Sequence, residues 1–432
     1  MSPDRGTKPR APSAGRLEAR QRTETDAPRT SEQPEALWPA VTWEELAWES
    51  NEPPDLLSRS AAQQMREPYR ASITASIADL EVRLPRSTAA AAEEAAALIR
   101  DFDNEVGREV APFAAILLRS ESASSSQIEN ITSGAKQIGL AEIGEDARAD
   151  AAMIVGNVEA MRAAIALSQT VDADSIRAMH RALLVRTAPD VAGRWRTEQV
   201  WIGGGGYSPH NASFVPPQAD RVPGAIADLV AFADRDDIPA LQHAAIAHAQ
   251  FETIHPFVDG NGRTGRALVH SLLRRRALTR SVTVPVSAGL LADTDRYFDA
   301  LSAYRSGDPA PIVDAMADAA TFSVANGRIL VADLRATKEA WTARVKARSD
   351  SAVWPLIDLV LRQPVISTAV VMTEIGVNYT NAMKAIGRLV DAGALTEIGG
   401  RRRSILWQAT EVLSALDTFA ARAGRRRLTG AD

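Results

Sequence analysis

The twelve residues 255–266, HPFVDGNGRTGR, constrain this chain more than any other stretch. They combine three glycines with two arginines, an aspartate, an asparagine and a histidine, a mixture too charged for a hydrophobic core and too ordered for a linker. Gly260 and Gly262 can adopt backbone angles that point successive N–H groups into one concavity. A helix that starts near Gly262 would add its positive N-terminal end. Together these features predict an anion site of the size of a phosphate group.

The side chains around these glycines suit a nucleoside polyphosphate. Arg263 and Arg266 are three residues apart, so they share one face of the helix and can both reach phosphate oxygens. Asp259 can hold a Mg²⁺ ion that bridges phosphate oxygens, and Asn261 can donate a hydrogen bond to one of them. His255 lies at the mouth of the loop, where an imidazole can act as a general base near neutral pH.

Other interpretations of the loop are disfavoured by its context. Its glycines match the G-x-G-x-x-G pattern of dinucleotide sites, but an alanine-rich helix rather than a buried strand precedes them, and no acidic residue follows about 20 positions later. A Walker A loop needs Gly-Lys-Ser/Thr, which is absent. His243, His248 and His255 are spaced five and seven apart, so they do not form the i, i+4 pair of a helical zinc site. We interpret His243 and His248 as partly buried helix residues.

Composition narrows the class of protein. The 432 residues allow two or three domains, and abundant alanine with few aromatic residues favours helices. A formal net charge of −5 argues against general nucleic-acid binding, and the absence of cysteine excludes disulfides and thiolate zinc sites. No apolar run approaches the roughly 18 residues of a membrane span. The polar N-terminal stretch lacks the apolar core of a signal peptide. We therefore expect a cytoplasmic protein without membrane contact.

The loop resembles the motif of the Fic, or Fido, family, H-x-F-x-[DE]-G-N-G-R-x-x-R, without a departure. The matching positions are His255, Phe257, Asp259, Gly260, Asn261, Gly262, Arg263 and Arg266. The resemblance implies a mainly α fold with the Fic helical core. It also implies a protein adenylyltransferase, which transfers AMP from ATP to a Ser, Thr or Tyr hydroxyl of an unknown target protein. In such an enzyme residues 260–266, including Thr264 and Gly265, hold the phosphates of ATP, Asp259 binds Mg²⁺ and His255 removes the hydroxyl proton.

A flap and a nucleotide contact are expected from two further stretches. VWI at 200–202 is strand-like, and four consecutive glycines and later FVPP follow it, which predicts an exposed hairpin. The resemblance implies that Val200, Trp201, Ile202 and Gly203 pair with an extended segment of the target. Tyr297 is a candidate for the adenine side of the nucleotide.

An upstream stretch, SSSQIENI at 124–131, is similar to the inhibitory motif of one class of this family, [ST]-x-x-x-E-[GN]. The matching positions are Ser125, Glu129 and Asn130. A carboxylate at the γ-phosphate position would pair with Arg266, so that ATP would bind with its α-phosphate misaligned for attack. In some members of the family the same glutamate helps to remove AMP from a target, and the sequence leaves forward and reverse activity open.

Residues 351–408 predict a different module. A helix (STAVVMTEIG), a turn, a second helix (TNAMKAIGRLVDAG) and two short strands follow one another. This order resembles the winged helix-turn-helix of many bacterial Fic proteins. Arg401–Arg403 and Arg425–Arg427 could bind DNA phosphates, but the second helix offers few base-reading side chains. Contact with a protein, including a homodimer partner, is therefore favoured over DNA binding.

The predicted organisation has five parts. They are a disordered tail (1–35), a helical region with the inhibitory helix (36–150), the Fic catalytic core with its hairpin flap (151–330), a helical connector (331–350) and the winged helix-turn-helix (351–425). Two rival functions stay open. One is a winged-helix transcriptional regulator whose Fic domain only senses a nucleotide, which the intact His255 disfavours. The other is a Fic enzyme that transfers a different phosphate-containing group.

Overall fold

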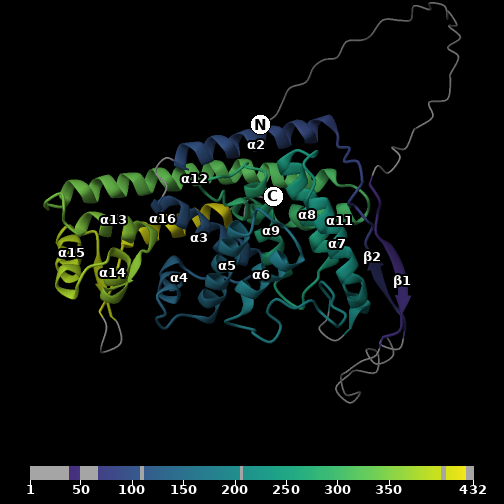
Figure 1. The fold of residues 1–432 in the computed structure, drawn as a ribbon, viewed down its shortest axis with the longest axis horizontal. Coiled ribbons are helices and arrows are strands. Elements are labelled where there is room, and N and C mark those ends of the chain that lie inside the picture. The colour runs from purple at the N-terminus through teal and green to yellow at the C-terminus, as the bar shows by residue number, and fades with distance from the viewer. Residues whose placement is uncertain (1–37, 49–66, 108–110, 205–207, 400–404, 425–432) are drawn as a thin grey trace, which may run out of the picture. The chain divides into compact units, whose positions relative to one another are not determined.

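The computed structural model describes residues 38–48, 67–107, 111–204, 208–399 and 405–424 (Figure 1). Most of these residues are helical, which confirms the predicted mainly α class. The helices are α2 (Arg86–Gly107), α3 (Ala111–Ile128), α4 (Ala135–Glu142), α5 (Ala149–Ala166), α6 (Ala173–Leu184), α7 (Val222–Ala233), α8 (Ala240–Ile254), α9 (Asn261–Arg275), α10 (Val286–Ala292), α11 (Thr294–Arg305), α12 (Ala310–Arg344), α13 (Val353–Arg362), α14 (Thr368–Ile375), α15 (Tyr379–Asp391) and α16 (Thr410–Gly424). The strands are β1 (Thr42–Leu46), β2 (Tyr69–Ile73), β3 (Val365–Ser367), β4 (Thr396–Ile398) and β5 (Leu406–Gln408).

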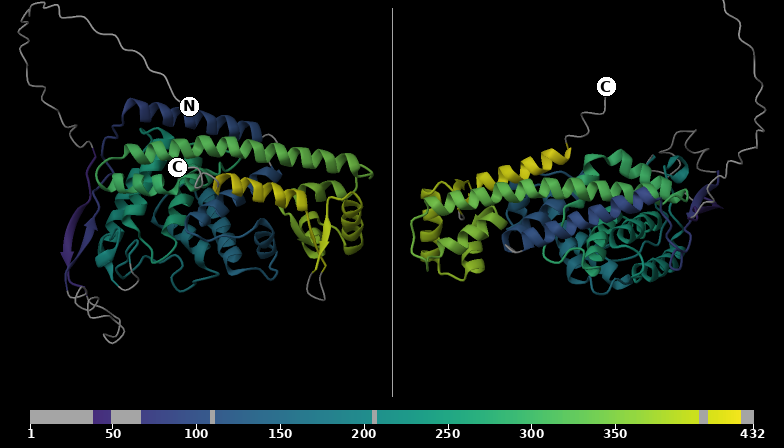
Figure 2. Two further views of the ribbon diagram at one scale, coloured as in Figure 1. Left: turned by 180° about the vertical axis from the view of Figure 1, so that it is seen from behind. Right: turned by 90° about the horizontal axis from the view of Figure 1, so that it is seen from above.

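The core is built around α8, α9 and α12. α8 is buried from Leu241 to Ile254, because its many alanines let neighbouring helices approach it closely. α9 packs directly against α8, and α12 packs along α2, as Figures 1 and 2 show for the long helix and its neighbour. The loop between α8 and α9 is therefore anchored at both ends by buried helices.

A β-hairpin precedes the helices, so the helical pattern predicted from residue 36 onward was wrong at its start. β1 pairs antiparallel with β2, with Thr42 opposite Ile73. β2 also joins a later part of the chain, since the Ser72 N–H donates to the Val215 carbonyl at 3.0 Å. This strand therefore forms because it contacts residues that are far away in the sequence. Local periodicity does not reveal such contacts.

The C-terminal elements occur where the sequence predicted them. α14 ends at Gly376, whose φ of 73° is left-handed, and Asn378 caps α15. The strands form an antiparallel sheet in the order β3-β5-β4. The winged-helix assignment and its partner stay predictions. The arginines at 401–403 and 425–427 lie outside the described residues, as does the predicted tail 1–35.

The described residues from 38 to 424 form one compact unit. α12 runs without a break through the boundary predicted at 330, because it carries buried residues on both sides of that point. Near its end Trp341 is fully buried, and its indole N–H donates to a Glu411 carboxylate oxygen of α16 at 2.6 Å. Among the described residues no helix combines the length and apolarity that crossing a membrane requires.

Candidate functional site

The loop between α8 and α9 turns through two residues with left-handed backbone conformations. His255 ends α8 with φ 49°, and Gly260 precedes α9 with φ 76°. The Asn261 side chain closes the loop: its Oδ1 accepts from the Phe257 N–H at 2.9 Å, and its Nδ2 donates to the Phe257 carbonyl at 2.8 Å. The Asn261 side chain thus holds the loop, and it is only 2% exposed.

His180 of α6 supports the loop from behind, a role that the sequence did not suggest. Its Nδ1 accepts from the Gly193 N–H at 2.9 Å, so Nε2 carries the proton and donates to the Asp259 carbonyl at 2.9 Å. The ring stacks on Phe257 with centroids 3.6 Å apart. Burial lowers the pKa of His180 to about 4, which keeps the imidazole neutral. The available signal was a histidine on the otherwise apolar face of a helix.

His255 is neutral at physiological pH and largely enclosed. Its side chain is 18% exposed, and its Nδ1 lies 3.8 Å from a carboxylate oxygen of Glu252. Burial, followed by the positive charges of Arg305 and Arg196, lowers the pKa of His255 to about 3. Burial also raises the pKa of Glu252 to about 7. The imidazole is therefore neutral with one unprotonated ring nitrogen, and burial in this conformation disfavours its protonation.

Arg196 holds the backbone of His255 in place. Its Nε donates to the His255 carbonyl at 2.9 Å, and its backbone N–H donates to the Pro256 carbonyl at 3.0 Å. The same guanidinium donates to the carbonyls of Glu198 and Pro217. Sequence reasoning missed Arg196, because its partners are backbone carbonyls that carry no sequence signal.

Two buried arginines at the start of α9 share one carboxylate. The Arg263 Nε lies 2.7 Å from Glu129 Oε2, and the Arg266 Nη2 lies 2.8 Å from Glu129 Oε1. Ser125 also binds Arg266, since the Ser125 hydroxyl and carbonyl oxygens each accept a hydrogen bond from this guanidinium at 2.8 Å. Arg266 is the partner expected from the sequence, and Arg263 is a second one that was not expected.

The backbone around Glu129 and the space beside it place its carboxylate between the two arginines. Asn130 has a φ of 62°, a left-handed conformation that asparagine tolerates well, and it turns the chain directly after Glu129. Gly262 leaves room for the carboxylate, because a Cβ there would lie 2.4 Å from Glu129 Oε1. Asn157 of α5 holds α3 in register by donating to the Ser122 carbonyl at 2.8 Å.

Asp259 is the carboxylate best placed to receive a cation. Its side chain is 60% exposed, and its oxygens lie 3.4 Å from Arg263 Nη2, at the long end of hydrogen bonding. Within the described ranges no cluster of three or more acidic or histidine side chains could hold a metal. A single carboxylate fits Mg²⁺, which takes its remaining ligands from water and substrate phosphates.

Three predicted nucleotide contacts face the core instead. Tyr297 is 1% exposed, and its hydroxyl is hydrogen-bonded to His248 Nε2 at 2.7 Å, so its ring cannot line an open adenine site. Thr264 is fully buried. Gly265 faces α8, where a Cβ would lie 2.8 Å from Glu252 Oε1. Membership of the motif did not reveal which side of α9 Thr264 and Gly265 occupy.

The predicted flap is a short hairpin. Ile202 forms an antiparallel bridge with Phe214, and its N–H donates to the Phe214 carbonyl at 2.9 Å. Val200 leads into the bridge, and Gly203 leaves it with a φ of 73°. Residues 205–207 lie outside the described part of the chain.

The N-terminal hairpin braces this flap. Trp201 packs edge-on against Trp48, with ring centroids 5.5 Å apart, and Trp48 packs in the same way on Tyr69 of β2 at 5.8 Å. The flap is therefore positioned by a segment that lies far before it in the sequence.

Comparisons with known proteins agree on one family. Residues 170–273 match the model of the Fic/DOC family. Over 143 residues the chain is 33% identical to the protein adenylyltransferase fic-1 of Caenorhabditis elegans, which covers 32% of this chain and 25% of that one. It is 29% identical over 149 residues to the protein adenylyltransferase Fic of Nematostella vectensis, covering 34% and 31%. The match thus spans about a quarter to a third of the length of these curated relatives.

A solved structure of similar arrangement is a Fic family protein from Desulfovibrio desulfuricans G20. It is 22% identical, with a TM-score of 0.47, and the match covers 74% of this chain and 95% of that one.

Proposed function

We propose that the chain is a protein adenylyltransferase, which moves the AMP group of ATP to a Ser, Thr or Tyr hydroxyl of a target protein, because residues 170–273 match the model of the Fic/DOC family. The observation that carries this proposal is the Glu129 carboxylate bridging Arg263 and Arg266 at the start of α9. Two buried cations at a helix N-terminus form a site for an anion of high charge density, which suits a polyphosphate.

The reaction uses the neutral imidazole beside this site. The target hydroxyl oxygen attacks the α-phosphorus, and its proton passes to the free ring nitrogen of His255. The bond between the α-phosphorus and the oxygen that bridges to the β-phosphate breaks, and pyrophosphate leaves. Arg196 keeps His255 at a fixed position through its carbonyl. Most of the rate enhancement comes from positioning and charge compensation, as in other phosphoryl transfers.

Asp259 would hold the Mg²⁺ ion that accompanies ATP. Its exposed carboxylate and its position before the first turn of α9 suit that role. When bound, Mg²⁺ offsets negative charge on the phosphate oxygens. The flap at 200–203 would bind an extended segment of the target by strand addition.

Glu129 acts as a built-in inhibitor in this proposal. Its carboxylate binds the two arginines that would otherwise bind the terminal phosphate of ATP. ATP must therefore compete with an anion of the same chain, which is present at a high effective concentration. Activation then requires Glu129 to leave.

One labelling experiment tests the enzyme and the inhibitor together. Wild type, Glu129→Gly and Glu129→Gly with His255→Ala are incubated with Mg²⁺, cell lysate and ATP labelled at either the α- or the γ-phosphate. We expect protein label from the α-position only, strongest in Glu129→Gly and absent in the double variant. Label from the γ-position would contradict nucleotidyl transfer. Absence of any label in Glu129→Gly would favour the nucleotide-sensing regulator.

A further inference from the structure

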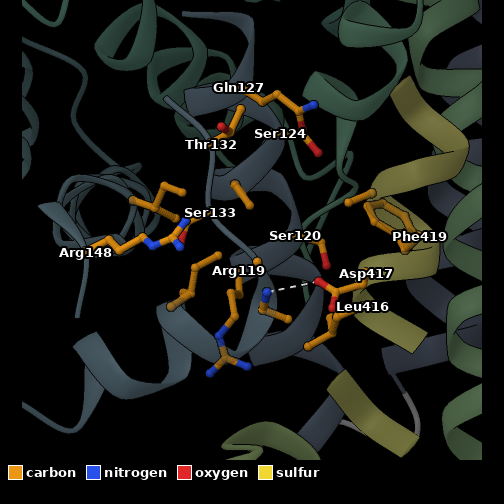
Figure 3. Close-up of a pocket in the computed structure, with 16 residues that line it drawn as sticks. Arg119, Ser120, Ser124, Gln127, Thr132, Ser133, Arg148, Leu416, Asp417 and Phe419 are labelled. Carbon is orange, nitrogen blue, oxygen red and sulfur yellow. Dashed lines mark hydrogen bonds between the residues drawn. The ribbon is translucent and has the colours of Figure 1, made fainter. Parts of the chain in front are cut away.

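A cavity of about 330 Å³ lies between α3, the loop 131–134 and α16 (Figure 3). α3 contributes Ser120, Ser124 and Gln127, the loop contributes Ser133, and α16 contributes Phe419. None of the residues lining it belongs to the loop between α8 and α9. The space is far larger than the roughly 15 Å³ that a single water molecule needs, so it has room for a small organic molecule.

α3 is the wall between this cavity and the anion site. Ser120, Ser124 and Gln127 are four and three residues apart, so they lie on one face of the helix. At about 100° per residue, Ser125 falls on a different side of α3, and Glu129 follows directly after the last residue of the helix. Helix α3 thus lines the cavity with one side, and the buried arginines are contacted from another side and from the residue after its end.

Two hydroxyls in the cavity wall are buried without a partner. The Ser120 Oγ and the Ser133 Oγ make no hydrogen bond within the described residues, and Ser120 is only 5% exposed. One comes from α3 and the other from the loop, so they belong to different walls of the cavity (Figure 3). Buried polar atoms nearly always have partners, so a ligand or ordered water supplies these.

One positively charged side chain in the cavity wall is not paired with a carboxylate among the described residues. Arg148 lines the cavity, is an exposed residue, and takes part in none of the ion pairs found among the described residues. The other charges are already engaged. Arg119 is paired with Glu142 at 2.7 Å through Nη2, and its buried Nη1 has no hydrogen-bond partner among the described residues. The Asp417 carboxylate accepts from the Ala135 N–H at 3.0 Å, as the dashed line in Figure 3 marks. An anionic group is therefore the charge that this cavity accepts.

We propose that the cavity binds a small anionic amphiphile, a molecule with a carboxylate or phosphate group on a compact apolar body. The oxyanion meets Arg148 and accepts hydrogen bonds from the hydroxyls of Ser120 and Ser133. The apolar body packs against apolar lining side chains such as Ile154 of α5 and Leu416 of α16.

Occupancy of the cavity holds Glu129 in place. The cavity is formed in the conformation in which Glu129 binds the arginines, and the loop 131–134 that lines it follows Glu129 directly. A ligand that prefers this conformation shifts the population towards it. The ligand therefore acts as a co-inhibitor, a consequence that rests on the proposed function of the anion site.

Binding is measured on the full chain with two probes, benzoate and phenyl phosphate, and with benzyl alcohol as the neutral control. Isothermal titration should detect at least one anionic probe in preference to benzyl alcohol, and the tighter of the two identifies the head group. Arg148→Gln should weaken binding about fivefold. Ser120→Ala should weaken it without lowering the melting temperature, since the lost hydroxyl has no protein partner. The matched control, Arg100→Gln at an exposed position of α2, should bind as wild type.

Two results would overturn the site. One is the absence of binding by both anionic probes, which would mean that ordered water alone satisfies the hydroxyls. The other is unchanged binding in Arg148→Gln and Ser120→Ala.

Coupling to Glu129 has a separate readout. Saturating probe should slow hydrogen exchange of the amides at 126–134, and unchanged exchange would refute the co-inhibitor role. Neither measurement uses ATP. Failure of AMP transfer would therefore refute the proposed function and the co-inhibitor role that rests on it, but not the cavity site. Failure of probe binding would refute the cavity site and leave the proposed function intact.

Discussion

Gly262 and Glu129 are in such close contact that any side chain at position 262 would collide with the carboxylate. A Cβ at Gly262 would lie 2.4 Å from Glu129 Oε1 and 2.8 Å from Arg266 Nη1. This glycine is needed for space rather than for an unusual backbone angle, since it is helical within the first turn of α9. The space it leaves is where an anion meets the two arginines.

We expect Gly262→Ala to impair the enzyme even when the inhibitor is gone. The methyl group occupies the place of the carboxylate, and it would equally obstruct a phosphate. The double variant Gly262→Ala with Glu129→Gly should therefore stay well below Glu129→Gly in the α-label assay, by about tenfold or more. Equal activity of these two variants would show that the phosphate does not enter this space. Gly387→Ala is the control, because a Cβ at that position would meet nothing within 4 Å.

Removal of the Glu129 carboxylate should raise activity and lower stability together. Glu129→Gly leaves two buried guanidinium groups without their shared anion, which costs about 3 kcal/mol. Glu129→Gln keeps the size without the charge and should fall between wild type and glycine in both properties. Melting temperature without nucleotide and initial rate of labelling are the measurements. Addition of ATP should restore most of the lost melting temperature in Glu129→Gly, and no such recovery would argue against phosphate binding at these arginines.

Arg196 should act on the rate of the chemical step rather than on nucleotide binding. Arg196→Lys cannot make several hydrogen bonds from one planar group, so the His255 carbonyl loses its fixed partner. In the Glu129→Gly background we expect kcat to fall about tenfold or more while the KM for ATP changes little. Arg194→Lys, two residues earlier and exposed, is the matched control. A rise in KM with kcat intact would assign Arg196 to substrate binding.

Acid should destabilise the fold because of its buried imidazoles. Four histidines have folded-state pKa values of about 4 or about 3, below their ordinary value of 6.5: His180, His243, His248 and His255. Below pH 6.5 the unfolded chain binds more protons than the folded one, so stability is lost as the pH falls towards 4, by about 1.4 kcal/mol per pH unit for each group. Glu252 has the opposite effect on stability. Because its pKa is raised to about 7 in the folded state, the folded chain binds this proton first as the pH falls, which offsets the loss of stability from one histidine.

Urea unfolding between about pH 7 and pH 5 measures this dependence. His243→Gln should make the slope shallower by one proton, and an unchanged slope would mean that His243 does not titrate as described. The same substitution should leave the α-label rate at neutral pH unaltered, because His243 contacts a backbone carbonyl away from the loop.

Local patterns were enough to predict most of the helices. The dense loop at 255–266 could be interpreted because the proposed phosphate binding needs glycines, arginines and an acid close together in sequence. Other features depend on pairs that are distant in sequence. Arg263 and Glu129 are separated by 134 positions, and no local pattern indicates that their side chains meet. His180 and Arg196 bind backbone carbonyls, which every residue possesses. The burial of Tyr297 against His248 was not foreseen, because an amphipathic helix does not specify what covers its buried face.

α12 makes truncation at the predicted connector a poor experiment. Its 35 residues extend for about 50 Å, and Trp341 near its end is buried by a contact with Glu411 of α16. A clone that stops after residue 350 would uncover that indole and remove the α16 wall beside α3. The C-terminal elements therefore share one cooperative unfolding unit with the core. A shortened protein would report the properties of a partly exposed hydrophobic surface rather than those of an isolated catalytic domain.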